Sequence, residues 1–218
     1  TSKINGAILY PGDEFSFYDY VVPFTKENGY ELAGSYSDGA TVQTYGGGIC
    51  QVVTTLYQAA LNAELEITQR FAHSMTVGYA PMAGDAAIAG TYKNLKFKNN
   101  NEFPIYIEGY CKNGFVYFNI YGVETRPANR VVTFESEILS ESDPGTIYTL
   151  SEAQPIGAYI RETPKHMGCV AKYWKIVTVD GVRKEKIFVN KSTYRASAGK
   201  YTLGIGGATA EQLATLKA

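Results

Sequence analysis

The feature that most constrains the fold is a run of three glycines placed directly before the clearest helical pattern in the chain. Residues 46–48 are all glycine, and residues 50–63 carry polar side chains at helical spacing. These polar side chains, which form one stripe along a helix, are Gln51, Thr55, Gln58 and Asn62. Valine, leucine and alanine cover most of the remaining surface. We therefore expect a largely buried helix that opens with Gly-Gly-Gly-Ile-Cys.

Short strand patterns surround this helix and predict an α+β fold of mostly antiparallel strands. The first 45 residues predict turns and short strands. The strands predicted between the helix and residue 121 are 65–71, 74–79, 95–98, 104–110 and 115–121, with hairpin-type turns at 99–101 and 112–114. Residues 122–130, rich in glycine, proline and asparagine, predict a domain boundary. Later strands are predicted at 131–139, 157–161, 170–179 and 184–189, with a tight turn at Asp180-Gly181. The expected parts are a first domain at 1–124, a small all-β module at 125–207 and a tail at 208–218 that forms a short helix or frays.

Charge and composition exclude several classes of protein. The net charge is −1 and no basic stripe occurs, so we expect no nucleic-acid partner. No segment approaches the ~18 to 20 apolar residues of a membrane-spanning helix, and an export or anchoring segment would lie outside these residues. Three cysteines cannot all pair with one another, so at least one thiol is free. The pair His166 and Cys169 lacks the second pair of ligands that a four-ligand metal site needs. Neither a metal nor another cofactor is expected.

Cys50 is the candidate nucleophile because it follows the glycines and begins the predicted helix. A thiol attacks as its thiolate, and a helix N-terminus or a nearby imidazole lowers a thiol pKa below the usual value of about 8.5. Unpaired N–H groups at the same helix start, around Gly48, Ile49 and Gln51, are suited to binding an oxyanion. The alternative is a buried structural cysteine, which is a common role for a free thiol. From the residues alone, the two interpretations are about equally supported.

The choice of a base for this thiol is narrow, because the chain has only two histidines. His73 lies between two predicted strands, and a helix followed by a strand can return it to the helix start. Asp85 is the candidate for the group that orients the imidazole, and an ordinary turn aspartate is an equally good interpretation. His166 is interpreted as a surface or turn residue outside the site.

These residues belong to a longer pattern that resembles the VanW family. Its most specific part is the motif Gly46-Gly47-Gly48-Ile49-Cys50-Gln51 followed by the predicted helix. The shorter matching pieces are Pro11 to Phe17, Gly29 to Ala33, His73-Ser74, Gly84-Asp85-Ala86 and Leu95 to Asn100. The resemblance covers about the first 120 residues, so 1–124 is interpreted as a VanW-like catalytic domain. Residues 131–207, with Tyr194-Arg195 and the closing Gly204-Ile205-Gly206-Gly207, resemble the small glycine-bearing β module that often follows VanW domains, where it binds wall sugars or acts as a spacer.

The resemblance implies a bacterial surface protein that acts on peptidoglycan. VanW-type domains have been linked to L,D-transpeptidation, which forms 3-3 cross-links between stem peptides. By this resemblance Cys50 forms a thioacyl-enzyme, His73 acts as its base and Asp85 occupies a family position. Tyr45 and Tyr79 are expected to line the substrate groove because they lie close in sequence to Cys50 and His73.

The expected partners are therefore stem peptides and glycan. The expected location is extracytoplasmic, at the cell wall, through an anchor outside these residues. Two alternatives remain open. One is a non-catalytic wall-binding module whose tyrosines stack on sugar rings, and the other is a cysteine peptidase or carboxypeptidase that acts on stem peptides.

Overall fold

Strands dominate the architecture of the protein. The computed structural model describes residues 1–37 and 40–216, and 48% of the chain forms strands against 13% in helices. The prediction of mostly antiparallel strands is confirmed, and the chain is mostly β with few helices. None of the helices in the described residues has the length and apolar character to span a membrane.

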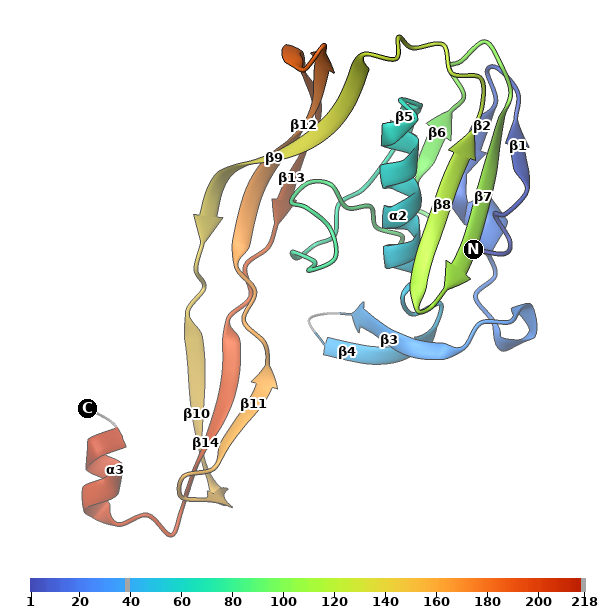
Figure 1. Cartoon of the computed structure of the whole chain (residues 1–218). Coiled ribbons are helices and arrows are strands. Elements are labelled where there is room, and N and C mark those ends of the chain that lie inside the picture. Colours follow the sequence, from blue (N-terminus) through green and yellow to red (C-terminus); the bar gives the residue numbers. More distant parts are fainter. Residues whose placement is uncertain (38–39, 217–218) are drawn as a thin grey trace.

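The longest described helix, α2 (Ile49–Asn62), lies between two small sheets (Figure 1). One sheet has the order β1 (Ala7–Leu9), β7 (Ile105–Lys112) and β8 (Phe115–Tyr121). The other has the order β2 (Glu14–Ser16), β6 (Lys96–Lys98) and β5 (Glu66–Gln69). Both sheets are antiparallel throughout.

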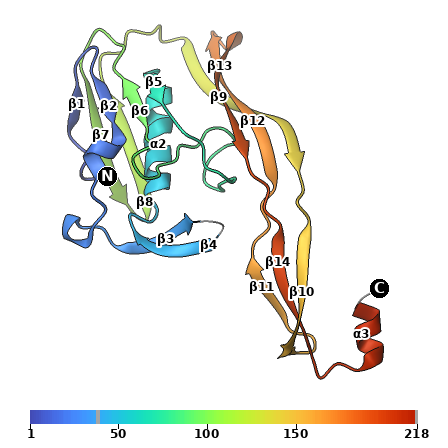
Figure 2. The same ribbon diagram turned by 180° about the vertical axis from the view of Figure 1, so that it is seen from behind.

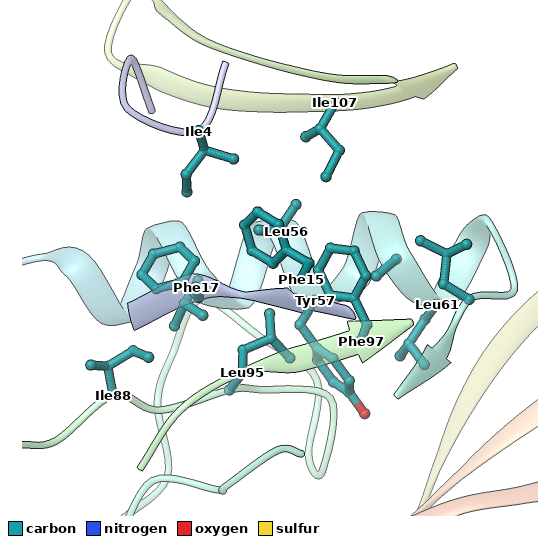
Figure 3. Packing of buried hydrophobic residues seen from close by; sticks show 14 of the residues in the cluster. Ile4, Phe15, Phe17, Leu56, Tyr57, Leu61, Ile88, Leu95, Phe97 and Ile107 are labelled. Carbon is teal, nitrogen blue, oxygen red and sulfur yellow. The ribbon is translucent and has the colours of Figure 1, made fainter. Parts of the chain in front are cut away.

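Apolar side chains from both sheets pack against α2 and form the core. Figure 3 shows Ile4 and Ile107 on one side of the helix, and Phe15 and Phe97 on the other. The α2 residue Leu56 is fully buried between these groups. Burial of such side chains supplies the main favourable free energy of folding, so the core also holds the start of α2 in place.

The remaining N-terminal elements are short. They are α1 (Phe17–Val21), the 3₁₀ helix η1 (Lys26–Asn28), and the hairpin of β3 (Leu32–Ser37) and β4 (Ala40–Tyr45). Strand β4 ends directly before the three glycines, so the hairpin and α2 are joined by the glycine turn alone.

Long strands make up the C-terminal half. One antiparallel sheet has the order β13 (Val182–Tyr194), β12 (Gly168–Val179) and β9 (Arg130–Ser142). A second sheet has the order β10 (Thr146–Pro155), β14 (Gly199–Gly206) and β11 (Tyr159–Thr163), in which β10 and β14 run parallel. In both views the first of these sheets faces the irregular loops beside α2, while the second extends away and leads to α3 (Ala210–Leu216) (Figures 1 and 2).

Most of the predicted strands are present, with three differences. Residues 74–79 form bends and turns rather than a strand, because no neighbouring strand pairs with them in the described chain. The turn at 99–101 does not close a hairpin, since β6 and β7 belong to different sheets. Strands β10 and β14 were not predicted, and their parallel pairing joins segments far apart in sequence. The turns at 112–114 and Asp180-Gly181 do close antiparallel pairs, and their Asn-Gly and Asp-Gly residues have positive φ angles.

The two halves of the chain share one hydrophobic cluster. Besides the residues around α2, this cluster contains Cys169, Ala171 and Tyr173 from β12 and Tyr194 from β13. The division into parts at 1–124, 125–207 and 208–218 stays a prediction, and residues 217–218 of the predicted tail lie outside the described residues.

Backbone geometry explains the three glycines before α2. Gly46 and Gly48 have φ angles of +87° and +82°, in the left-handed region that residues with a side chain rarely adopt. A Cβ atom on Gly47 would lie 2.4 Å from the carbonyl oxygen of Ala33 in β3. The triplet therefore forms a tight turn that packs against the β3–β4 hairpin and sets where α2 begins.

Replacing Gly47 tests this constraint. We expect Gly47→Ala to lower the free energy of unfolding by about 1–3 kcal/mol, because the clashing atoms belong to the backbone and cannot move cheaply. Gly78→Ala is the matched control, since no heavy atom lies within 4 Å of its Cβ position. Urea denaturation of both variants gives the measurement, and equal stability of the two would contradict the packing argument.

Candidate active site

Cys50 is the second residue of α2 and lies in its first turn. The N–H groups of a first helical turn carry partial positive charge, which favours a thiolate there. The side chain is half-buried rather than sealed in the core, and its Sγ donates a hydrogen bond to the carbonyl oxygen of Ile88 at 3.6 Å. The thiol also interacts with the side chain of His73.

His73 lies in the irregular loop after β5, and both of its ring nitrogens contact other side chains. Its Nδ1 lies 2.6 Å from Oδ2 of Asp85, and its backbone N–H donates to the same oxygen at 2.8 Å. Because Nδ1 faces a carboxylate, Nδ1 carries a proton, which leaves Nε2 for the thiol side. The hydroxyl of Tyr79 lies 3.2 Å from Nε2. The imidazole is thus fixed between Asp85 and Cys50, with 16% of its side chain exposed.

Asp85 is fully buried, and both of its oxygens accept hydrogen bonds. Oδ2 accepts from His73, while Oδ1 accepts from Nη2 of Arg70 at 2.8 Å and from the hydroxyl of Tyr194 at 2.5 Å. A buried carboxylate is costly unless it is paired and hydrogen-bonded, and both conditions are met here. Asp85 can therefore stay ionised and orient the imidazole.

Helix α2 also fixes the segment that carries Asp85. Thr54, one turn after Cys50, donates its hydroxyl to the carbonyl oxygen of Ala86 at 2.9 Å and accepts from the Ala86 N–H at 3.0 Å. The Gln58 side chain donates to the carbonyl oxygen of Gly84. The thiol and the carboxylate are therefore positioned by one rigid element.

The charges of these groups support one another. Burial by itself raises the pKa of the Cys50 thiol, but the interactions with His73 and the charge of Lys93 outweigh it, so the pKa is lowered overall. Burial lowers the pKa of His73, but the hydrogen bonds to Asp85 and Cys50 raise it overall, to about 9. Burial opposes ionisation of Asp85, yet His73 and Arg70 bring its pKa down to about 2. Both shifts favour the charged forms of the pair, a thiolate beside an imidazolium.

The tyrosine Tyr79 contributes differently. Burial, together with the negative charges of Cys50 and Asp85, raises its pKa above the usual value of a phenol. It therefore stays a neutral hydrogen-bonding group beside the imidazole. With 41% of its surface exposed, it contacts both His73 and solvent, and its role in lining a substrate groove stays a prediction.

The N–H groups predicted to bind an oxyanion are only partly available. The Ile49 N–H donates to the carbonyl oxygen of Gly46 at 3.1 Å, and the Gln51 N–H donates to that of Gly48 at 3.0 Å. In the described part of the chain, the N–H groups of Gly48 and Cys50 donate to no protein acceptor. Those two groups, rather than Ile49 and Gln51, are the available donors next to the thiol.

The other predicted groove residue, Tyr45, ends β4 and is 37% exposed. No contact joins it to Cys50 or His73 among the described residues, so its role stays a prediction. His166 forms an isolated bridge with Ser197, in the C-terminal half, and is not part of this site. The described residues hold no group of three His, Cys, Asp or Glu side chains suited to a metal ion.

Sequence reasoning missed the residues that hold Asp85. Arg70 is nearly buried and sends Nε to the Asp85 carbonyl oxygen at 2.6 Å as well as Nη2 to the carboxylate. An arginine at the end of a half-buried strand is a signal that a buried carboxylate is near. No local signal points to Thr54 or to Tyr194, which lies 109 residues from Asp85.

A cavity of about 870 Å³ lies elsewhere, at the other end of α2. Glu64 lines it together with Arg126, Arg130 and Lys175, each of which donates a hydrogen bond to the Glu64 carboxylate. The pKa of Glu64 falls to about 2 because Arg130 and the other two cations outweigh its partial burial. This charge cluster links the end of α2 to the C-terminal strands and lies apart from Cys50.

Known proteins resemble the first half of the chain. Residues 1–121 match the family described as VanW like protein. The uncharacterized protein YoaR of Bacillus subtilis is 33% identical over 118 residues, which cover 54% of this chain and 39% of YoaR. The vancomycin B-type resistance protein VanW of Enterococcus faecalis is 29% identical over 104 residues, which cover 45% of this chain and 38% of that protein. The chain therefore spans about two fifths of each curated relative.

The chain was also compared with solved structures. The G5 domain structure of an IgA1 protease is 14% identical and covers 35% of this chain and 93% of its own length. The TM-score is 0.23, a value that supports no conclusion about this chain.

The interaction between Cys50 and His73 predicts that Cys50 and Cys169 react differently. We expect iodoacetamide to alkylate Cys50 in mildly acidic solution, where an ordinary thiol with a pKa of about 8.5 reacts slowly. Cys169 should resist, because burial removes it from reagent and raises its pKa. Mass spectrometry of peptides after timed alkylation measures each cysteine separately.

Removing the imidazole should slow that reaction. In His73→Ala the thiolate loses its main stabilising partner, so alkylation of Cys50 at pH 6.5 should fall about tenfold or more. His166→Ala is the matched control and should react as the unmodified chain does. An unchanged rate in His73→Ala would show that the imidazole does not activate the thiol.

Proposed function

Because the chain belongs to the VanW-like family, as its residues 1–121 show, we propose that it is a cysteine-dependent peptidoglycan L,D-transpeptidase. The observation that carries the proposal is the chain of contacts from Cys50 through His73 to the buried Asp85. A thiol, an imidazole and an orienting carboxylate in this order are the groups that cysteine acyl transfer uses.

The first half-reaction forms a thioacyl-enzyme. The Cys50 thiolate attacks the carbonyl carbon that joins the third residue of a donor stem peptide to its terminal D-alanine. The resulting oxyanion is stabilised by N–H groups next to the thiol, those of Gly48 and Cys50. The C–N bond then breaks, the His73 imidazolium gives its proton to the departing amine, and D-alanine leaves.

The second half-reaction forms the cross-link. The amine of a diamino acid side chain on a second stem attacks the thioester carbonyl. Neutral His73 accepts the proton of this amine while the C–S bond breaks and Cys50 leaves as a thiolate. The thiolate–imidazolium pair is thereby regenerated, and no other reactant is consumed.

The electrostatics of the site support this cycle. The first half-reaction needs Cys50 as a thiolate and His73 as an imidazolium at the same time. Thiolate forms as the pH rises through the lowered pKa of Cys50, and the imidazolium is lost as the pH rises through about 9. The pH profile of transpeptidation is therefore bell-shaped, with a falling limb near pH 9.

The family and its vancomycin-resistance member support a location and a substrate for the proposed reaction. One relative is named for vancomycin B-type resistance, which supports an envelope substrate for this chain as well. On this proposal the chain acts on stem peptides outside the bacterial cytoplasm, at the cell wall. Water in place of the acceptor amine would make the same thioacyl-enzyme a carboxypeptidase, so the product distinguishes the two activities.

The decisive measurement uses a disaccharide-tetrapeptide as both donor and acceptor. We expect the chain to release D-alanine and form a cross-linked dimer, and Cys50→Ala to lose at least about 10³-fold of that activity. Cys111→Ala is the matched control, because Cys111 is exposed on β7, and it should retain full activity.

Mass spectrometry separates the outcomes. Equal dimer formation by Cys50→Ala and the unmodified chain would refute the proposal. Release of D-alanine without any dimer would also refute transpeptidation and assign a carboxypeptidase to the same thiol. Absence of both products in the unmodified chain would favour a wall-binding role.

A further inference from the structure

Strand β13, in the C-terminal half, contacts the group that orients the imidazole. The side chain of Tyr194 is 3% exposed and donates its hydroxyl to Oδ1 of Asp85 at 2.5 Å. The same hydroxyl accepts a hydrogen bond from the Ala83 N–H at 2.8 Å. Tyr194 therefore holds both the Asp85 carboxylate and the backbone two residues before it.

Arg70 extends this contact to two more residues of β13. Its Nη1 donates to Oγ of Ser192 at 2.8 Å and to Oδ1 of Asn190 at 3.2 Å, while its Nη2 reaches Asp85. The planar guanidinium has donors in fixed directions, so holding Nη1 also fixes the direction of Nη2. Strand β13 thus controls both donors to Asp85 Oδ1.

The loops that carry His73 and Asp85 are clamped between α2 and the C-terminal strands. On the strand side, Asn190 donates to the Ala83 carbonyl oxygen at 3.0 Å and the Arg195 N–H donates to that of Ser74 at 2.7 Å. On the helix side, Thr54 binds Ala86. Figures 1 and 2 both show these loops between α2 and the sheet of β9, β12 and β13.

We propose that Tyr194 is a positioning residue for the Cys50–His73 pair, so that the C-terminal strands complete the site and are not a separate wall-binding or spacer module. This inference rests on the proposed catalytic role of that pair. Tyr194 lies outside the stretch that matches the family, residues 1–121. The family domain of this chain therefore depends on residues beyond its own end.

The physical argument concerns rotation of the Asp85 carboxylate. Hydrogen bonds from Arg70 and Tyr194 to Oδ1 restrict rotation of the carboxylate and so keep Oδ2 directed at the imidazole. Without the Tyr194 hydroxyl, the Ala83 N–H also loses its acceptor and the Asp85 segment loosens. Arg70 still neutralises part of the carboxylate charge, so the loss of orientation dominates. His73 then holds its proton less firmly and stabilises the thiolate less.

The test is Tyr194→Phe in the full chain, with the ionisation of Cys50 followed by alkylation rate against pH. We expect the midpoint of this titration to move up by about one pH unit, which lowers alkylation at pH 6.5 about tenfold. Tyr173→Phe is the matched control. Tyr173 is equally buried on the neighbouring strand β12, and its hydroxyl binds Gln58 at 3.3 Å instead of Asp85.

Both variants lose one buried hydroxyl at the same interface, so a purely structural effect would appear in both. An unchanged midpoint in Tyr194→Phe, or an equal shift in Tyr173→Phe, would overturn the proposal. If circular dichroism shows that Tyr194→Phe is unfolded, Ser192→Ala is used instead. This variant removes one of the hydrogen-bond acceptors of Arg70. Ser192→Ala should also raise the midpoint, and an unchanged value would overturn the proposal.

A second readout separates this proposal from the proposed function. With the disaccharide-tetrapeptide, we expect Tyr194→Phe to lower kcat about tenfold and leave KM nearly unchanged, since the hydroxyl does not touch substrate. The alkylation titration needs no substrate. A shifted midpoint in a chain that makes no dimer would therefore support Tyr194 as a positioning residue while refuting transpeptidation.

Discussion

The buried carboxylate of Asp85 is the constraint on which the rest of the site depends. A charge with no exposed surface is tolerated only where several donors replace water. Asp85 meets this condition through His73 and Arg70, which both lie in the loop after β5, and through Tyr194 at the end of β13. Satisfying one charge therefore brings together the Asp85 segment, the loop after β5 and strand β13.

Helix α2 connects the candidate active site to the hydrophobic core. Its apolar side packs between two small sheets, and its first turn presents Cys50. The polar stripe read from the sequence does not simply face solvent. The Gln58 side chain donates a hydrogen bond to the Gly84 carbonyl oxygen and accepts one from the Tyr173 hydroxyl. Its neighbour Tyr57, outside the stripe, accepts a hydrogen bond from the Asn190 side chain at 3.0 Å. The helix thus orders the Asp85 loop and the C-terminal strands at the same time.

The arrangement also connects stability with reactivity. The thiol is half-buried at a helix start, while its partner imidazole is locked against a carboxylate that cannot reach solvent. The stretch that matches the VanW-like family shares its hydrophobic cluster with β12 and β13, and its Arg70 donates a hydrogen bond to Ser192 of β13.

Local sequence determined much of this protein. The glycine triplet, the helix after it, most strands and the tight Asn-Gly and Asp-Gly turns follow from residue preferences within a few positions. The candidate residues Cys50, His73 and Asp85 could also be chosen from the sequence, because a free thiol at a helix start, a rare histidine and a nearby acid are visible there. Residues 74–79 alternate like a strand, but they form bends and turns and belong to none of the described sheets.

Tertiary structure alone decided which groups complete the site. Tyr194 and Ser192 reach Asp85 and Arg70 from more than a hundred residues away, and no pattern in the chain marks those contacts. The same holds for the parallel pairing of β10 with β14. Local propensity reports how a segment folds by itself, whereas satisfying a buried charge and pairing distant strands depend on which segments meet in space.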